Sequence, residues 1–287
     1  MDKNKIVRVA TSDGLYLHGY FAQKSGKVAL LHIHGFEGNF YENQFVWSIA
    51  DELNRKGITF LAVNTRGNGK DTDFNTVDEK IVRIGGHYES IDDAHLDISA
   101  WIKFLLDQGH EEIYLQGHSL GTVKSIRYSF EGKYKDKIKK LILICPFDGK
   151  AMIDRDIKKN IDELVKNAGE KIKQGKGEEL ASEEFETVGM SYKTYVSWYQ
   201  RSEFGRMFEF CNKDYDFPLL QKIKVKTKII VGSKDEFFHV SNPDHPEEAV
   251  KIMLNKISTS EAKIIQNASH SFIGFEEELV KEVVDFI

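Results

Sequence analysis

Cysteine and proline are both rare in this sequence. Only two of the 287 residues are cysteines, Cys145 and Cys211, and only four are prolines. The two cysteines lie far apart and neither belongs to a CxxC pair, which excludes a disulfide framework and a cysteine-based zinc cluster. We interpret both as ordinary reduced cysteines in a globular chain, of which 41% is hydrophobic and 30% charged.

Long apolar runs and an excess of positive charge are also missing. No segment approaches the ~18 apolar residues of a membrane span, and the first residues lack the apolar stretch of a secretory signal. We therefore expect a cytoplasmic protein without a membrane partner. Lys and Arg number 40 against 45 Asp and Glu, a net charge of -5, so no nucleic-acid partner is expected.

Motifs for cofactors and metals are absent too. The sequence contains no GxxxxGK[ST], no HExxH and no GxGxxG after a strand. His32 and His34 could be metal ligands on one face of a strand, but no third ligand follows at a recognisable spacing. We expect neither a cofactor nor a metal.

The pattern of apolar residues predicts an α/β fold. Short runs rich in β-branched residues alternate with amphipathic segments, as in a mostly parallel sheet with crossover helices. We expect strands at 6–10, 15–21, 28–34, 58–64, 113–116, 140–145, 228–231 and 262–265. The turn sequence TSDG predicts that the first two form a hairpin. Helices are expected at 44–55, 91–106 and 246–257, and from about 276 to the end.

The segment 149–217 breaks this alternation, because it holds helix-like stretches and no convincing buried strand. A length of roughly seventy residues is well beyond an ordinary connection. We therefore predict a core of residues 1–148 and 218–287 with a helical cap at 149–217. Ile153, Ile157, Ile161 and Leu164 form one helical stripe, and Tyr192, Tyr195, Trp198 and Tyr199 form either the packed interior of the cap or a wall for an acyl group.

One stretch indicates nucleophilic chemistry. Ser119 stands at the centre of GHSLG, after the apolar strand IYLQ and before a segment able to form a helix. GxSxG alone is a weak signal, but a sharp strand-to-helix turn would expose the serine hydroxyl. A serine needs a base to accept its proton, and the base needs an acid to orient it.

Both partners are found after later strands. Asp235 follows the strand at 228–231 and His270 follows the strand at 262–265, so the expected order is Ser119, Asp235, His270. His239 and His245 are alternatives for the base. Asp148 and Glu236 are alternatives for the acid.

Two backbone donors should stabilise the oxyanion that forms when the serine attacks a carbonyl. Leu120 N–H supplies the first from the elbow itself. Phe36 N–H supplies the second from the loop HGFEGN, where Gly35 lets the backbone approach the substrate.

Six motifs together resemble the α/β-hydrolase superfamily. They are HGFEGN, NTRGNGKD, DDAHLDISAWIKFL, LQGHSLG, VGSKDE and NASHSF, and they cover nearly all of the chain. The set is most similar to bacterial serine carboxylesterases of the cinnamoyl and feruloyl esterase type, which implies hydrolysis of hydroxycinnamoyl or other acyl esters with the cap forming part of the pocket.

We therefore expect a serine hydrolase that cleaves a small-molecule carboxylic ester through an acyl-enzyme on Ser119. A thioesterase or an amidase would use the same residues, and a binding protein could keep the fold without turnover. The aromatic cap segment could support a homodimer.

Overall fold

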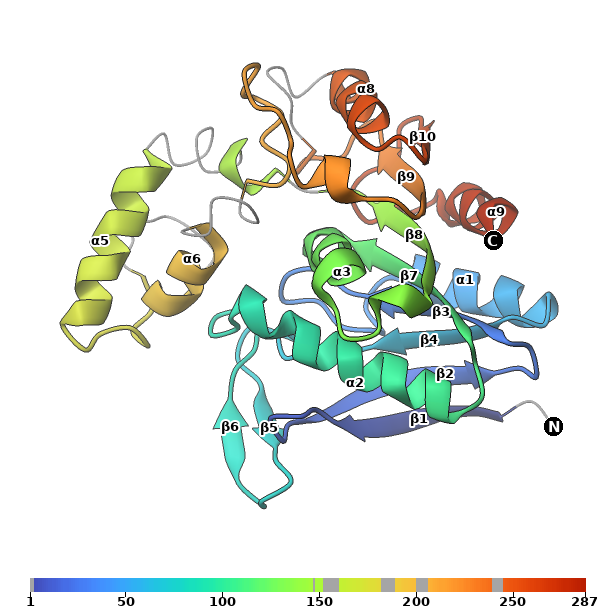
Figure 1. Cartoon of the computed structure of the whole chain (residues 1–287), viewed down its shortest axis with the longest axis horizontal. Helices are drawn as coiled ribbons and strands as arrows, with labels where there is room; N and C mark the ends of the chain where they lie inside the picture. Colours follow the sequence, from blue (N-terminus) through green and yellow to red (C-terminus); the bar gives the residue numbers. More distant parts are fainter. Residues whose placement is uncertain (1–2, 147, 152–159, 182–188, 200–205, 239–244) are drawn as a thin grey trace.

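An eight-stranded sheet forms the centre of the protein. A computed structural model describes residues 3–146, 148–151, 160–181, 189–199, 206–238 and 245–287. The sheet order is β1-β2-β4-β3-β7-β8-β9-β10 (Figure 1). Its strands are β1 (Lys3–Ala10), β2 (Tyr16–Gln23), β3 (Val28–Ile33), β4 (Thr59–Val63), β7 (Glu112–His118), β8 (Ile138–Ile144), β9 (Lys226–Gly232) and β10 (Ser260–Ile265). All eight predicted strands are present, with bounds close to those expected.

The strand directions bring several loops to one edge of the sheet. β1 and β2 form the predicted antiparallel hairpin, and β2 is antiparallel to β4. From β4 through β3, β7, β8 and β9 to β10, neighbouring strands are parallel. The loops that leave their carboxyl ends therefore meet at the same edge, where α/β sheets bind ligands.

A second, two-stranded sheet was not predicted. It consists of β5 (Asp73–Asn75) and β6 (Ile81–Arg83). Each strand has only three residues, and β6 is exposed along its whole length. With one buried residue in β5 and none in β6, these strands are too short to give the sustained alternation by which strands are recognised.

Helices cover both faces of the main sheet. α1 (Gln44–Arg55) and α9 (Glu276–Phe286) pack on each other and share one apolar cluster with the sheet, whereas α2 (Ala94–Asp107), α3 (Leu120–Glu131) and α8 (Pro246–Lys256) belong to the other cluster. Within β3, Leu30 lies in the first cluster and Leu31 in the second, as the pleat requires. Gly57 (φ 76°) ends α1 as predicted.

Short 3-10 turns complete the core. η1 (Ile91–Asp93) leads into α2, so the predicted helix at 91–106 begins as a 3-10 turn. The other two are η2 (Lys135–Lys137) and η4 (Leu220–Lys222). No helix in the described ranges has the length and apolar character needed to cross a membrane.

The described part of the segment 149–217 contains the helices α5 (Ile161–Lys173) and α6 (Tyr192–Tyr199), together with turns and coil. The two helices pack on each other, and Figure 1 shows them together beside the sheet. Ile161 and Leu164 lie on the buried side of α5, whereas Ile153 and Ile157 fall outside the described residues. A single antiparallel bridge joins Leu180 to Ser191.

Candidate active site

Ser119 lies on a sharp turn between β7 and α3. Its backbone has φ 55° and ψ −125°, a conformation that costs a non-glycine residue about 1–3 kcal/mol. The flanking glycines make the turn possible. A Cβ on Gly117 would lie 2.2 Å from the Gly121 carbonyl oxygen, and one on Gly121 would lie 2.3 Å from the Ile33 carbonyl oxygen. This geometry is the nucleophile elbow that the GHSLG sequence predicts.

Asp235 and His270 are hydrogen-bonded to each other at the same edge of the sheet. Both Asp235 carboxylate oxygens accept from His270 Nδ1, at 2.9 and 3.0 Å. Burial opposes ionisation of Asp235, but the hydrogen bonds from His270 and Cys145 outweigh it and hold the pKa of this carboxyl below its ordinary value. Phe237 N–H also donates to the carboxylate, at 2.9 Å. Asp235 is therefore an ionised acid that orients the imidazole.

The alternative acids take other positions. Glu236 accepts from the backbone N–H of His270 at 3.3 Å. Asp148 accepts 2.9 Å hydrogen bonds from the backbone N–H groups of Ala151 and Phe210. Asp148 thus links the two ends of the segment 149–217. Burial raises the pKa of Asp148 to about 7.

The structure describes one of the two alternative bases. His245 precedes α8 and is exposed. His239 lies outside the described residues. His270 lines the same cavity as Ser119.

The loop after β3 packs directly on Ser119. A Cβ on Gly35 would lie 2.8 Å from Ser119 Cβ, so glycine allows this close approach. Among the described residues, neither Phe36 N–H nor Leu120 N–H donates a hydrogen bond. Two unoccupied donors beside the serine have the arrangement expected of an oxyanion hole.

His34 fixes this loop rather than binding a metal. Its Nδ1 donates to the Gly35 carbonyl at 2.7 Å, and its Nε2 accepts from Thr65 N–H at 3.0 Å. Burial, reinforced by the charge of Lys124, lowers the pKa of His34 to about 3, so the ring is neutral. His32 bonds Gln116 through Nδ1 at 2.7 Å. The hydrogen bonds of both histidines are structural.

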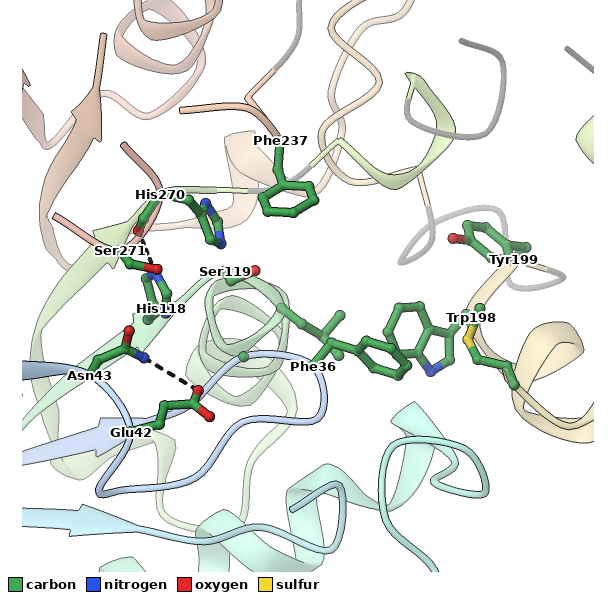
Figure 2. A pocket seen from close by; sticks show the side chains of 13 residues that line it. Phe36, Glu42, Asn43, His118, Ser119, Trp198, Tyr199, Phe237, His270 and Ser271 are labelled. Atoms are coloured by element: carbon green, nitrogen blue, oxygen red, sulfur yellow. Dashed lines mark hydrogen bonds between the residues drawn. The ribbon is translucent and has the colours of Figure 1, made fainter. Parts of the chain in front are cut away.

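One cavity of about 470 Å³ joins these groups (Figure 2). Figure 2 shows Ser119 between two ends of different character. At one end lie His118, His270, Ser271, Glu42 and Asn43. At the other end lie the aromatic rings of Phe36, Trp198 and Tyr199. Met190 also lines the cavity.

Of the four aromatic residues predicted to form either the interior of the segment 149–217 or a wall of the pocket, two take each position. Tyr192 and Tyr195 are buried in the interior and do not line the cavity. Trp198 and Tyr199 line it. The rings of Trp198 and Phe36 pack edge to face, with their centroids 5.0 Å apart. Within the described structure, the Trp198 indole nitrogen and the Tyr199 hydroxyl are buried without a hydrogen-bond partner.

Two site residues were missed by the sequence interpretation, His118 and Cys145. His118 donates to the backbone of His270, and the Cys145 thiol donates to Asp235. Their nitrogen and sulfur atoms, with those of His270, lie within 4.8 Å of one another, a spacing that could hold a metal. Burial, reinforced by the charge of Asp235, raises the pKa of Cys145 well above its ordinary value.

Comparison with known proteins agrees with this geometry. The family model described as "Serine aminopeptidase, S33" matches residues 24–278. The chain belongs to the serine aminopeptidase S33 family. Membership confirms the predicted α/β-hydrolase superfamily and the predicted enzyme class at the level of a serine hydrolase. The family name does not by itself assign a peptide substrate.

Solved structures share the fold of this S33 family member at low identity. The esterase Pf2001 of Pyrococcus furiosus is 19% identical with a TM-score of 0.60, over 99% of this chain and 92% of that one. Est1E from Butyrivibrio proteoclasticus, with ferulic acid bound, is 19% identical with a TM-score of 0.65, over 97% and 96%. The α/β hydrolase GrgF from Penicillium sp. sh18 is 16% identical with a TM-score of 0.64, over 99% and 97%. No curated protein matches the sequence.

Proposed function

We propose that this protein hydrolyses carboxylic esters of small acyl groups through an acyl-enzyme on Ser119. The observation that carries the proposal is the convergence on one cavity of the half-buried Ser119, of His270 with its partner Asp235 behind it, and of two unoccupied backbone donors. Each of these parts is required for acyl transfer, and together they come from the loops that follow β3, β7, β9 and β10 at the sheet edge.

The mechanism follows from these positions. His270 takes the proton from Ser119 as the serine oxygen bonds to the ester carbonyl carbon. The negative charge moves to the carbonyl oxygen, where Phe36 N–H and Leu120 N–H stabilise it. The bond to the alcohol oxygen then breaks, and His270 gives its proton to the departing alcohol. Water repeats the sequence, with His270 as base, and releases the acid.

This proton transfer assigns the two ends of the cavity. The leaving oxygen must lie next to His270, so the alcohol occupies the end near Ser271. The acyl group extends the other way, toward Trp198 and Tyr199, in the segment that we propose acts as a cap. The aromatic walls suit a flat apolar acyl group.

Two buried polar atoms refine the choice of acyl group. The Tyr199 hydroxyl and the Trp198 indole N–H lack partners among the described residues. An unpaired buried polar group costs about 1–3 kcal/mol, which a polar atom on the substrate would offset. These atoms favour an aromatic acyl group with an oxygen at its far end, such as a hydroxycinnamoyl group, over an unsubstituted alkyl chain. Est1E, whose structure contains ferulic acid, is compatible with this choice.

A substrate panel tests the proposal. An oxygen ester, a thioester and an amide sharing one hydroxycinnamoyl group are assayed with the parent and with Ser119→Ala. We expect the ester to be hydrolysed fastest and the variant to lose activity by at least about 10³-fold. Equal hydrolysis of an ester by Ser119→Ala would overturn the assignment, and a faster thioester or amide would change the substrate class while keeping the mechanism.

A further inference from the structure

His118, the residue before the nucleophile, is attached to the residue proposed as the base. Its Nε2 lies 3.0 Å from the backbone oxygen of His270. Because a carbonyl oxygen can only accept, Nε2 of His118 carries the proton. His118 ends β7, the strand that leads directly into Ser119, whereas His270 belongs to the loop after β10.

The rings of the two histidines are also in contact. Their centroids are 4.7 Å apart with an angle of 41° between the planes. The ring of Phe237 forms an edge-to-face pair with that of His270, with the centroids 4.7 Å apart. Phe45 forms the same kind of pair with His118, at a centroid distance of 5.2 Å. Figure 2 shows His118 and Phe237 beside His270 in the cavity. These contacts restrict the position of the imidazole of His270.

His118 is built to stay neutral beside the base. It is 5% exposed, and burial, reinforced by the charge of His270, lowers the pKa of His118 to about 3. A neutral ring does not repel the imidazolium that forms on His270 during the reaction. The titratable groups around His118 are His32, His34, Cys145, Asp235 and His270.

The hydrogen bond joins the end of β7 to the loop after β10. The backbone N–H of His270 donates to Glu236 at a longer distance, 3.3 Å, and Glu236 comes from the loop of the acid. The bond from His118 instead reaches the strand of the nucleophile. Backbone displacement of His270 would change its distance to Ser119, and a 1 Å misplacement can cost about 10²-fold in rate.

We propose that His118 is a positioning residue that holds the backbone of His270 to the strand carrying Ser119 and so sets the distance between nucleophile and base. This inference rests on the proposed function. It assigns His118 no contact with the reacting atoms; it acts through His270.

The test compares two substitutions of His118. His118→Leu removes the donor and the ring, whereas His118→Gln retains an N–H that reaches the same carbonyl. We expect His118→Leu to lower kcat by about 10-fold or more with KM within about twofold, and His118→Gln to recover most of the loss. The rate of inactivation by a fluorophosphonate should follow kcat. If the leucine variant does not fold, His118→Asn, whose shorter amide cannot span the bond, replaces it.

His110→Leu is the matched control. His110 is 3% exposed, precedes β7, and bonds the Gly26 carbonyl through Nδ1 at 2.9 Å. The control loses the same kind of hydrogen bond at the opposite end of the strand. We expect it to lower the melting temperature without lowering kcat. Equal loss of kcat in His110→Leu, or kcat of His118→Leu within threefold of the parent, would overturn the proposal.

The parent enzyme separates the two proposals. If the parent neither hydrolyses esters nor reacts with the fluorophosphonate, the proposed function fails. If the parent is active and glutamine at position 118 performs no better than leucine, the proposed function stands and the positioning role fails.

Discussion

Replacing Asp235 with asparagine removes one negative charge while keeping the shape of the side chain. His270 Nδ1 lies 2.9 Å from the carboxylate of Asp235. Asp235 is buried, with 6% of its surface exposed. At an effective dielectric of about 20, opposite unit charges at this distance attract by about 5–6 kcal/mol. This attraction is present only when His270 is protonated, as it is near the transition state. At about 1.4 kcal/mol per tenfold, Asp235→Asn should lower kcat by about 10⁴-fold.

The assay is steady-state hydrolysis of a p-nitrophenyl ester, with melting temperatures recorded for each variant. Glu236→Gln is the control, because it removes a neighbouring charge and keeps the acceptor for the His270 backbone N–H. We expect Glu236→Gln to stay within about fivefold of the parent. A kcat of Asp235→Asn within tenfold of that of the parent would refute the electrostatic argument. If Glu236→Gln lost as much kcat as Asp235→Asn, Glu236 would share the role of the acid that we assign to Asp235.

Three further predictions concern stability and geometry. Gly121→Ala should abolish activity or folding, because its Cβ would lie 2.3 Å from a backbone oxygen, whereas Gly169→Ala in α5, with nothing within 4 Å, should stabilise by up to about 1 kcal/mol in thermal melts. Because the pKa of Asp148 is raised, its contribution to stability falls as pH rises from about 4 to about 7. The melting temperature of the parent should therefore fall relative to that of Asp148→Asn over that range. A constant difference between the two melting temperatures would contradict this. Lys124→Met should cost about 3–5 kcal/mol in urea unfolding, because it leaves Glu89 buried without its 2.6 Å partner, and adding Glu89→Leu should restore part of the loss.

The sequence was sufficient for the main sheet and for the groups at its edge. Buried strands give apolar runs that differ from the amphipathic helices between them, so β3, β7 and β9 were predicted close to their final bounds. Parallel strands end at one edge, which is why Asp235 and His270, distant in sequence, could be paired in advance. Their hydrogen bond agrees with that prediction, while their catalytic roles stay predictions.

Other features depend on packing that the sequence does not display. Asp148 was considered as an acid because it follows a strand, yet its carboxylate accepts from backbone N–H groups. Backbone N–H groups are present at nearly every residue, so no sequence pattern marks which ones are bonded. His118 is part of the motif itself, but its bond to His270 depends on the course of the loop after β10. Tyr199 lines the cavity and Tyr195 does not, and this difference likewise depends on how α6 is rotated about its axis.

The covalent intermediate offers the most direct test of the account. The enzyme is mixed with a slowly released aromatic ester, quenched in acid and digested, and the peptides are weighed by mass spectrometry. The account predicts the mass of the acyl group on the peptide that contains Ser119, and no such mass in Ser119→Ala. Ester hydrolysis by the parent with no acyl group on Ser119, or with the acyl group on another residue, would contradict it.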